Sequence, residues 1–369
     1  MSNQKVTPSV VTRDSKSSKK NSLYFDEDGI CEPCRLHEQF NNSINWEARE
    51  KELIKLLNKY RSINHSYDCI VPGSGGKDSI FQSLILKEKY GMNPLTVTWA
   101  PHIYTDVGKK NFESWISKGG FDNFLFTPSG DTQRKLTKLA YENMLHPFQP
   151  FIFGQRNFVV HMARQLGIKL IFFGENPAQY GGFKGESESP KANKKYFVDD
   201  NPEKIRVSGL TLEELEKDHN ITKEDLKYHL PLNSKEFEPL NLNIQWLGHY
   251  LQFHPQKNYY YAREKVGFIP NDQRTEGTYS RYNSIDDKLD GFHYWTGHIK
   301  FGVGRATHEA SQEVRNGDLI REEAVALVRK YDGELPTRYF SEVLEYLDLT
   351  EEKFMEVFIF VIGCISPKQ

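Results

Sequence analysis

The residues best suited to chemistry form one glycine-rich segment, Gly73-Ser74-Gly75-Gly76-Lys77-Asp78-Ser79. An apolar run, Cys69-Ile70-Val71, precedes the segment, and a sequence typical of a helix follows it. Glycines let the backbone approach a ligand closely, and the amide groups at the start of a helix carry roughly half a positive charge. Lys77 adds a full charge, and the hydroxyls of Ser74 and Ser79 add donors. The segment is therefore expected to hold an oxyanion such as phosphate.

This loop differs from a Walker A loop, which requires a glycine five residues before the Gly-Lys pair and a Ser or Thr after the lysine. Those two positions hold Val71 and Asp78. A plain glycine-rich turn, with a solvated Lys77 and with Asp78 capping the helix, is the alternative, but such a turn has no need of a lysine and two serines. The six residues Ser-Gly-Gly-Lys-Asp-Ser resemble the loop of PP-loop ATPases, which hold the pyrophosphate of ATP and transfer AMP. That resemblance implies ATP as cosubstrate, with Asp78 helping to hold Mg²⁺ on its phosphates.

The elements around the loop alternate between apolar runs and helical patterns, as in a parallel sheet with crossover helices. Expected strands are Tyr67–Val71, Leu95–Trp99, Asn123–Phe126 and Lys169–Phe173, and expected helices are Asp78–Tyr90, Val107–Gly119, Asp131–His146 and Gln155–Leu166. We expect an α/β fold with a parallel, doubly wound sheet of the PP-loop ATPase type. The expected divisions are a polar tail (1–22), a Cys-x-x-Cys knuckle and helix (23–65), the PP-loop domain (66–240) and a mainly helical C-terminal domain (241–369).

Further motifs narrow the reaction. The segments "YDCIVPGSGGKDS", "LKEKYGMNPLTVTW", "GQRN", "FFGENPAQYGG" and "KFGVGRATHEASQEVRNGDLIREEAVALVRKYDGE" together resemble the N-acetyl sugar amidotransferases of bacterial surface-polysaccharide and LPS O-antigen synthesis. The resemblance runs from about Leu23 to the C-terminus. It implies conversion of the acetamido group of a nucleotide-linked sugar to an acetamidino group. Adenylation of the poorly electrophilic amide would create a leaving group that ammonia displaces, with AMP and pyrophosphate as products.

Catalysis on such a route rests on placing the substrates and neutralising phosphate charge, because no nucleophilic side chain is required. We expect Lys77 and the loop amides to hold the pyrophosphate, and Trp99, at a strand end, to lie near the adenine unless it is plain core. Residues at the same sheet edge are candidates to orient the acetamido group or ammonia: Gln155, Arg156, Glu175 and Asn176. For Glu175 and Asn176 the alternative is local capping of their loop.

Two cations in the glycine-containing segment "GHIKFGVGRATHEAS", Lys300 and Arg305, are candidates to bind the phosphates of the sugar nucleotide or a carboxylate on the sugar. A turn between helices with solvated charges is the alternative. The sequence shows no glutaminase nucleophile, so we expect ammonia to come from separate glutaminase and cyclase-like subunits, as the resemblance implies.

Cys31 and Cys34 have the spacing of half a structural zinc site, which needs two more ligands. The preceding region "SVVTRDSKSSKK" contains no cysteine, so zinc is expected only if His37, Cys364 or another residue completes the set. An iron–sulfur cluster would need at least three thiolates. The small number of cysteines and the absence of an apolar leader predict a cytoplasmic location. The longest apolar run, "VFIFVIGCI", is half the length of a membrane span and is expected in the core.

Two other classes of function compete with this interpretation. A PP-loop enzyme that thiolates or amidates tRNA would favour a basic surface and a reactive cysteine, whereas the formal net charge is -2. No nucleic-acid partner is therefore expected. A scaffold without catalytic activity, built to dock a glutaminase, is disfavoured by the intact Ser-Gly-Gly-Lys-Asp-Ser loop.

Overall fold

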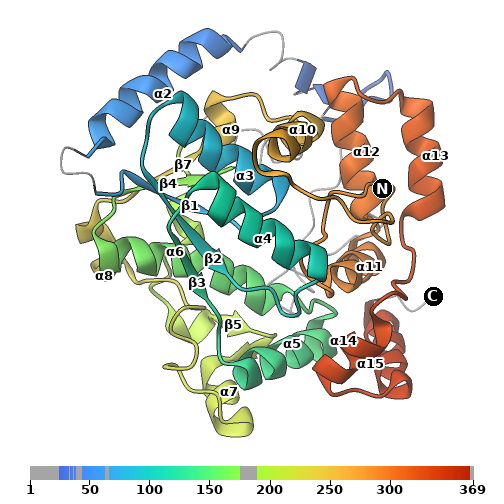
Figure 1. Ribbon diagram of the computed structural model, residues 1–369. Coiled ribbons are helices and arrows are strands. Elements are labelled where there is room, and N and C mark those ends of the chain that lie inside the picture. The colour runs from blue at the N-terminus through green and yellow to red at the C-terminus, as the bar shows by residue number, and fades with distance from the viewer. Residues whose placement is uncertain are drawn as a thin grey trace.

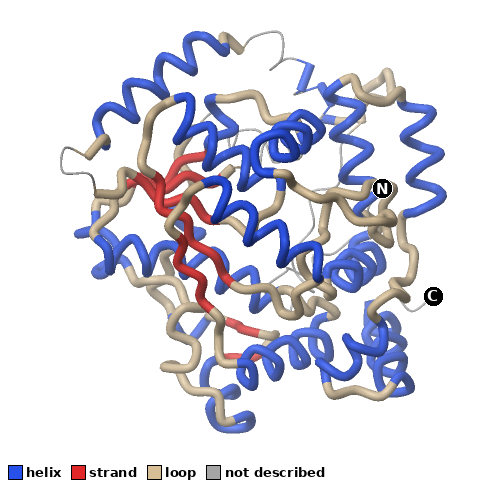
Figure 2. The backbone as a smooth tube through the Cα atoms, in the orientation of Figure 1, coloured by secondary structure: helices blue, strands red, loops and turns tan. Residues whose placement is uncertain are grey.

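The computed structural model describes residues 25–32, 34–35, 37–38, 44–62, 66–174 and 189–365, with side chains to residue 359. Five parallel strands form one sheet in the order β3-β2-β1-β4-β7. Figure 2 shows these strands as a red layer with helices on both sides. Their bounds are β1 (Cys69–Pro72), β2 (Pro94–Trp99), β3 (Asn123–Phe126), β4 (Leu170–Phe173) and β7 (Asn243–Trp246). The expected doubly wound α/β fold is confirmed.

Side chains alternate between the two faces of the sheet, as the period of a strand requires. Ile70 and Ile171 face a core that includes helix α6 (Gln149–Leu166). Cys69 and Val71 face the opposite core, beneath α2 (Trp46–Tyr60). On that second side α3 (Lys77–Leu84) continues as the π-helix η1 (Ile85–Lys89), next to α4 (Asp106–Gly119) and α10 (Pro255–Val266).

The fifth strand, β7, lies beyond the expected division at residue 240. Its four residues pair with β4 in parallel register from Leu170↔Asn243 to Phe173↔Trp246. The sheet therefore takes its last strand from the segment expected to be helical. Between β4 and β7 the chain forms a small β-hairpin, β5 (Arg206–Val207) and β6 (Leu210–Thr211), followed by α7 (Leu212–His219). Thr211 caps α7 through reciprocal hydrogen bonds with Glu214, a capping box.

Several shorter elements complete this region: η3 (Lys194–Tyr196), η4 (Pro202–Lys204), α8 (Ser234–Phe237), η5 (Glu238–Leu240) and α9 (Leu247–Tyr250). The chain after α10 is helical, as expected. It contains α11 (Asp290–Phe301), α12 (Arg305–Asn316), α13 (Arg321–Tyr331), α14 (Phe340–Leu347) and α15 (Glu351–Ile365). Figure 1 shows α12 and α13 side by side, in orange, and α14 and α15 beside α5 (Gly130–Met144).

The C-terminal helices share a core with the sheet domain. The ring of Phe354 on α15 stacks on that of Tyr141 on α5, with centroids 4.5 Å apart. Val357, in the apolar run near the C-terminus, packs into the same cluster, as expected. Within the described part of the chain, no helix is both long and apolar enough to cross a bilayer.

Candidate functional site

A cavity of about 550 Å³ opens at the carboxyl edge of the sheet. Pro72 ends β1 and Trp246 ends β7, while Gly174 directly follows β4, and all three line the cavity. The chain leaves β1 toward β2 and β3 and later returns to the other side of β1 as β4. Ligands of open α/β sheets bind at such a point of reversal.

The glycine-rich loop forms one wall of this cavity, from Gly73 to Ser79. Gly75 has a φ of +85°, and a β-carbon there would meet the Cα of Phe112 on α4 at 2.6 Å. A β-carbon on Gly73 would lie 2.4 Å from that of Ser79. Both positions thus require glycine, because the loop is folded tightly against α3 and α4. The amide end of α3 consequently faces the cavity.

Lys77 is only 5% exposed and lines the cavity. Its ammonium group lies 2.6 Å from one carboxylate oxygen of Asp78, and the other oxygen accepts a hydrogen bond from Asn258 at 2.9 Å. The ammonium also lies 5.6 Å from the ring centroid of Tyr282. Burial among these partners fixes the position of the charge that a phosphate group would meet.

The opposite wall comes from the segment 282–305, in which the sequence analysis had assigned only Lys300 and Arg305 to the site. Asp286, Asp287 and Asp290 all line the cavity. Burial raises the pKa of Asp286, although a hydrogen bond from Ser74 opposes the shift. The pKa of Asp290 is raised well above its usual value, first by burial and then by the two neighbouring carboxylates. The segment therefore places buried carboxylates across the cavity from the wall that carries the Lys77–Asp78 pair.

A signal for these aspartates is present in the sequence. They are interleaved with Ile285 and Leu289, which are 4% and 0% exposed. Carboxylates so close to fully buried apolar side chains are held near the core, where charge is costly unless it is used or paired. Asp287 is paired, since its carboxylate lies 2.7 Å from Nδ1 of His102.

Arg305 lines the cavity, as expected, and its Nε donates to Glu309 at 2.6 Å. Its guanidinium lies over the ring of Tyr294, 5.0 Å from the centroid. Gln155 is exposed and also lines the cavity. Glu175 and Asn176 lie outside the described residues.

Three expected site residues lie elsewhere. Lys300 is 3% exposed and donates to the carbonyl of Met144 at 2.8 Å, so it binds the C-terminal end of α5 rather than the cavity. Arg156 is not among the cavity residues, and its guanidinium lies 5.2 Å from the ring centroid of Tyr196. Trp99 is core and not a cavity residue, because its side chain points to the α6 side of the sheet.

The packing of Trp99 is tight. Its ring lies 5.8 Å from that of Phe158 and 4.9 Å from that of His229. A β-carbon on Gly154 of α6 would lie 2.2 Å from the indole. This close approach of α6 to β2 leaves the indole no access to a nucleotide.

An antiparallel bridge between Phe25 and Cys31 closes the turn that directly precedes the Cys-x-x-Cys segment. Cys31 and Cys34 are free thiols, and burial together with the adjacent Cys31 thiol raises the pKa of Cys34 to about 11. His37 is held by the backbone carbonyl of Arg315 at 2.7 Å. Among the described residues, no group of three or more His, Cys, Asp or Glu side chains is arranged to hold a metal ion. Cys364, one of the residues expected to complete a zinc site, lies outside the residues whose side chains are described.

The sheet order and the glycine-rich loop after β1 give a parallel α/β fold with a site at the carboxyl edge of the sheet, the arrangement that the sequence analysis expected of a PP-loop enzyme. Residues 276–359 match the model of the family described as "LPS biosynthesis protein WbpG-like, C-terminal domain". This matched segment includes Asp286, Asp290 and Arg305, and so supplies the second wall of the cavity.

Two other similarities concern relatives. An uncharacterized protein of Methanocaldococcus jannaschii, MJ1599, is 33% identical over 81 residues, which are 22% of this chain and 28% of that protein. Among solved structures, the U34-tRNA thiolase NcsA of Methanococcus maripaludis, with its [4Fe-4S] cluster, aligns over 93% of this chain and 91% of its own, with a TM-score of 0.34 and 11% identity.

Proposed function

We propose that this protein is an ATP-dependent amidotransferase acting on a nucleotide-linked N-acetyl sugar. It adenylates the acetamido oxygen and replaces it with ammonia, which yields an acetamidino sugar, AMP and pyrophosphate. The proposal places the reaction in the synthesis of LPS O-antigen or a related surface glycan.

One observation carries the proposal. One wall of the cavity is the glycine-rich loop of the sheet, and the other lies in the segment that matches the LPS biosynthesis family, so a single site combines the two features. The loop suits the phosphates of ATP. Residues 286–305 then face the space where the second substrate meets the nucleotide.

The loop fits the pyrophosphate half of ATP. Its glycines bring the backbone within reach of a ligand, and Lys77 lies at the same wall with its charge already oriented by Asp78. Asp78 and Asp286 provide the hard oxygen ligands that Mg²⁺ prefers, and Asp286 accepts a hydrogen bond from the loop itself through Ser74. Bound there, Mg²⁺ would neutralise phosphate charge.

The chemistry requires little beyond placement. An amide is stabilised by resonance and resists attack by ammonia. Transfer of AMP to its oxygen, with release of pyrophosphate, gives a leaving group. Ammonia then forms the new C–N bond as the C–O bond to AMP breaks. Gln155, exposed at the cavity wall, is suited to orient the acetamido group.

Ammonia must reach the cavity from outside this chain in the proposed reaction. Cys31 and Cys34 are neighbouring thiols in the N-terminal segment, and neither is in a disulfide. Cys69 is fully buried in β1, where burial raises the pKa of its thiol. A high pKa disfavours a nucleophilic thiolate. We therefore propose separate glutaminase and cyclase-like subunits as the physiological source of ammonia.

The test is direct turnover. The full chain is incubated with ATP, Mg²⁺, ammonium and a panel of UDP- and CMP-linked acetamido sugars, and products are followed by mass spectrometry. We expect a sugar product about one dalton lighter, because NH replaces oxygen, with AMP formed in equal amount. Formation of ADP, or AMP release without a sugar product on any member of the panel, would contradict the proposal. Activity on tRNA would favour the other PP-loop chemistry.

A further inference from the structure

A second cavity, of about 580 Å³, adjoins the first. Its walls come from α10, from the loop 270–282 and from α12 and α13, and Tyr282 is the residue that it shares with the first cavity. Both volumes fall within the range of about 300–1,000 Å³ that is typical of sites for one small-molecule ligand. The first cavity therefore accommodates one nucleotide, whereas the proposed reaction uses two: ATP and the nucleotide that carries the sugar.

A single aromatic ring separates the two spaces. The ring of Tyr282 stacks on that of Tyr259, with centroids 4.6 Å apart and planes 16° from parallel. The ammonium of Lys77 approaches the same Tyr282 ring from the first cavity, at 5.6 Å. The hydroxyl of Tyr282 donates to Glu313, in the second cavity, at 3.5 Å. A ligand in the second cavity is thus one ring away from the phosphate-binding lysine.

The lining of the second cavity suits a nucleoside phosphate. Arg263 and Arg281 are exposed cations at its walls. Nη1 of Arg263 donates to the hydroxyl of Tyr259 at 3.4 Å, and Nε of Arg281 donates to the carbonyl of Asn271 at 2.7 Å. Guanidinium groups held in this way bind phosphate through paired donors.

Deeper in the cavity, Ser280 is 6% exposed, and its buried hydroxyl has no hydrogen-bond partner among the described residues. A buried polar atom without a partner is costly, and a polar group of a ligand in this cavity would supply the missing hydrogen bond. Beside it, Glu313 accepts a hydrogen bond from Tyr279 at 2.6 Å. Tyrosine faces and a carboxylate acceptor are suited to a base and to ribose hydroxyls.

We propose that the second cavity binds the nucleoside-phosphate half of the sugar nucleotide, while the sugar reaches past Tyr282 to the phosphate loop. This inference rests on the proposed function for the identity of the ligand. It assigns the carrier nucleotide to Arg263, Arg281 and Ser280 and leaves the first cavity to ATP.

The experiment is a titration of the full chain with UDP and with CMP, measured by calorimetry in the presence of saturating AMP-PNP and Mg²⁺. We expect at least one of the two probes to bind while AMP-PNP is present. The double variant Arg263→Ala, Arg281→Ala is expected to lower the affinity for that probe by about tenfold or more, since each lost guanidinium removes a charge-assisted contact. Ser280→Ala, which removes one hydroxyl, tests the same site if the double variant is unstable.

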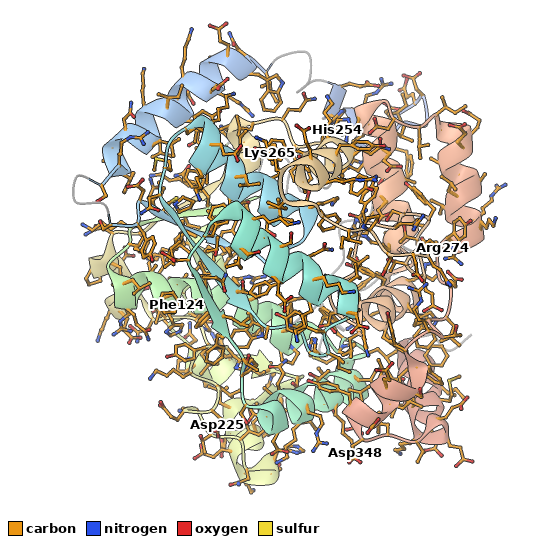
Figure 3. All side chains as sticks on the ribbon, in the orientation of Figure 1. Phe124, Asp225, His254, Lys265, Arg274 and Asp348 are labelled. Carbon is orange, nitrogen blue, oxygen red and sulfur yellow. The ribbon has the colours of Figure 1, made fainter. Side chains whose placement is uncertain are left out.

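Lys265→Ala is the matched control. Lys265, labelled in Figure 3, lies on α10 near Arg263 but pairs with Glu88 and does not line the second cavity. Its loss is expected to leave probe binding unchanged. Lys77→Ala is expected to lower the affinity for AMP-PNP and to leave the affinity for UDP or CMP unchanged.

Three results would overturn the inference: no binding of either probe at millimolar concentration, competition of the probe with AMP-PNP, or unchanged binding in both the arginine and the serine variants. The titration measures binding without turnover. A failed amidination assay therefore does not obscure its outcome, and a failed titration does not obscure turnover.

Discussion

Substitution of Gly75 by alanine tests the geometry of the phosphate loop. Gly75 has a φ of +85°, and its new β-carbon would lie 2.6 Å from the Cα and 2.9 Å from the amide nitrogen of Phe112. Both atoms belong to the backbone of α4, so no rotamer change removes the contact. The left-handed conformation costs an L-residue about 1–2 kcal/mol. The added methyl group in a packed contact costs about 1–3 kcal/mol.

The two costs together predict that Gly75→Ala lowers the free energy of unfolding by about 2–5 kcal/mol. That is a large fraction of the roughly 5–15 kcal/mol that stabilises a typical domain. Urea denaturation followed by circular dichroism measures the loss. Affinity for AMP-PNP is expected to fall as well, because the loop must move away from α4.

Gly76→Ala is the matched control in the same loop. Gly76 has an ordinary φ of -70°, and the nearest atom to its new β-carbon is the Ser74 hydroxyl at 3.6 Å. Gly76 is the N-cap of α3, and its substitution by alanine is expected to lower the free energy of unfolding by less than about 1 kcal/mol. Equal stability of the two variants would refute the close approach of loop and helix from which the site is built.

Three further predictions address individual residues. Lys77→Met keeps the buried stem and removes the charge, so AMP formation is expected to fall by about 100-fold or more while the circular dichroism spectrum stays native; a loss of only a few-fold would contradict its role. Asp290→Asn removes a carboxylate whose pKa is raised in the folded state. Such a group makes the folded protein less stable as pH rises from the pKa of the unfolded state toward that of the folded state. Melting curves are therefore expected to show the variant as more stable than the unmodified protein at pH 8. The difference in melting temperature is expected to close as pH falls toward 4. The opposite trend would show that Asp290 gains from being charged. Trp99→Phe is expected to reduce stability by about 1–3 kcal/mol and to leave the KM for ATP unchanged. A change in KM without loss of stability would return Trp99 to the adenine site.

Local patterns predicted four of the five strands of the sheet closely and missed β7. The expected strand 123–126 coincides with β3, and the expected helix 107–119 differs from α4 by one residue at its start. Helix α6 begins at Gln149, six residues before its expected start, because Pro150 occupies its first turn and was not recognised as a helix start. Alternating apolar runs predict strands well since each run must be buried on a face of the sheet.

Predictions for the loop rest on local chemistry, whereas candidates elsewhere in the chain had mixed outcomes: Gln155 and Arg305 line the cavity, but Trp99 and Lys300 do not. Lys77 and Asp78 lie in the cavity because loop and helix start are consecutive in the chain. Trp99 was predicted from its position at a strand end. Its side chain points to the face of the sheet that α6 covers, and therefore away from the cavity. Lys300 was predicted from its charge. It lies on α11, where its ammonium group donates to the carbonyl of Met144 at the end of α5 instead of facing the cavity.

The amino-acid sequence alone determined the glycine-rich loop, four strands of the parallel sheet and the helical C-terminal region, because each depends on neighbours along the chain. Tertiary structure decided which side chains share the cavity. Asp286 meets Ser74 across more than two hundred residues of sequence, and Tyr282 divides two cavities that no local pattern reveals. Such contacts depend on how helices pack on the sheet, and packing is a property of the whole chain.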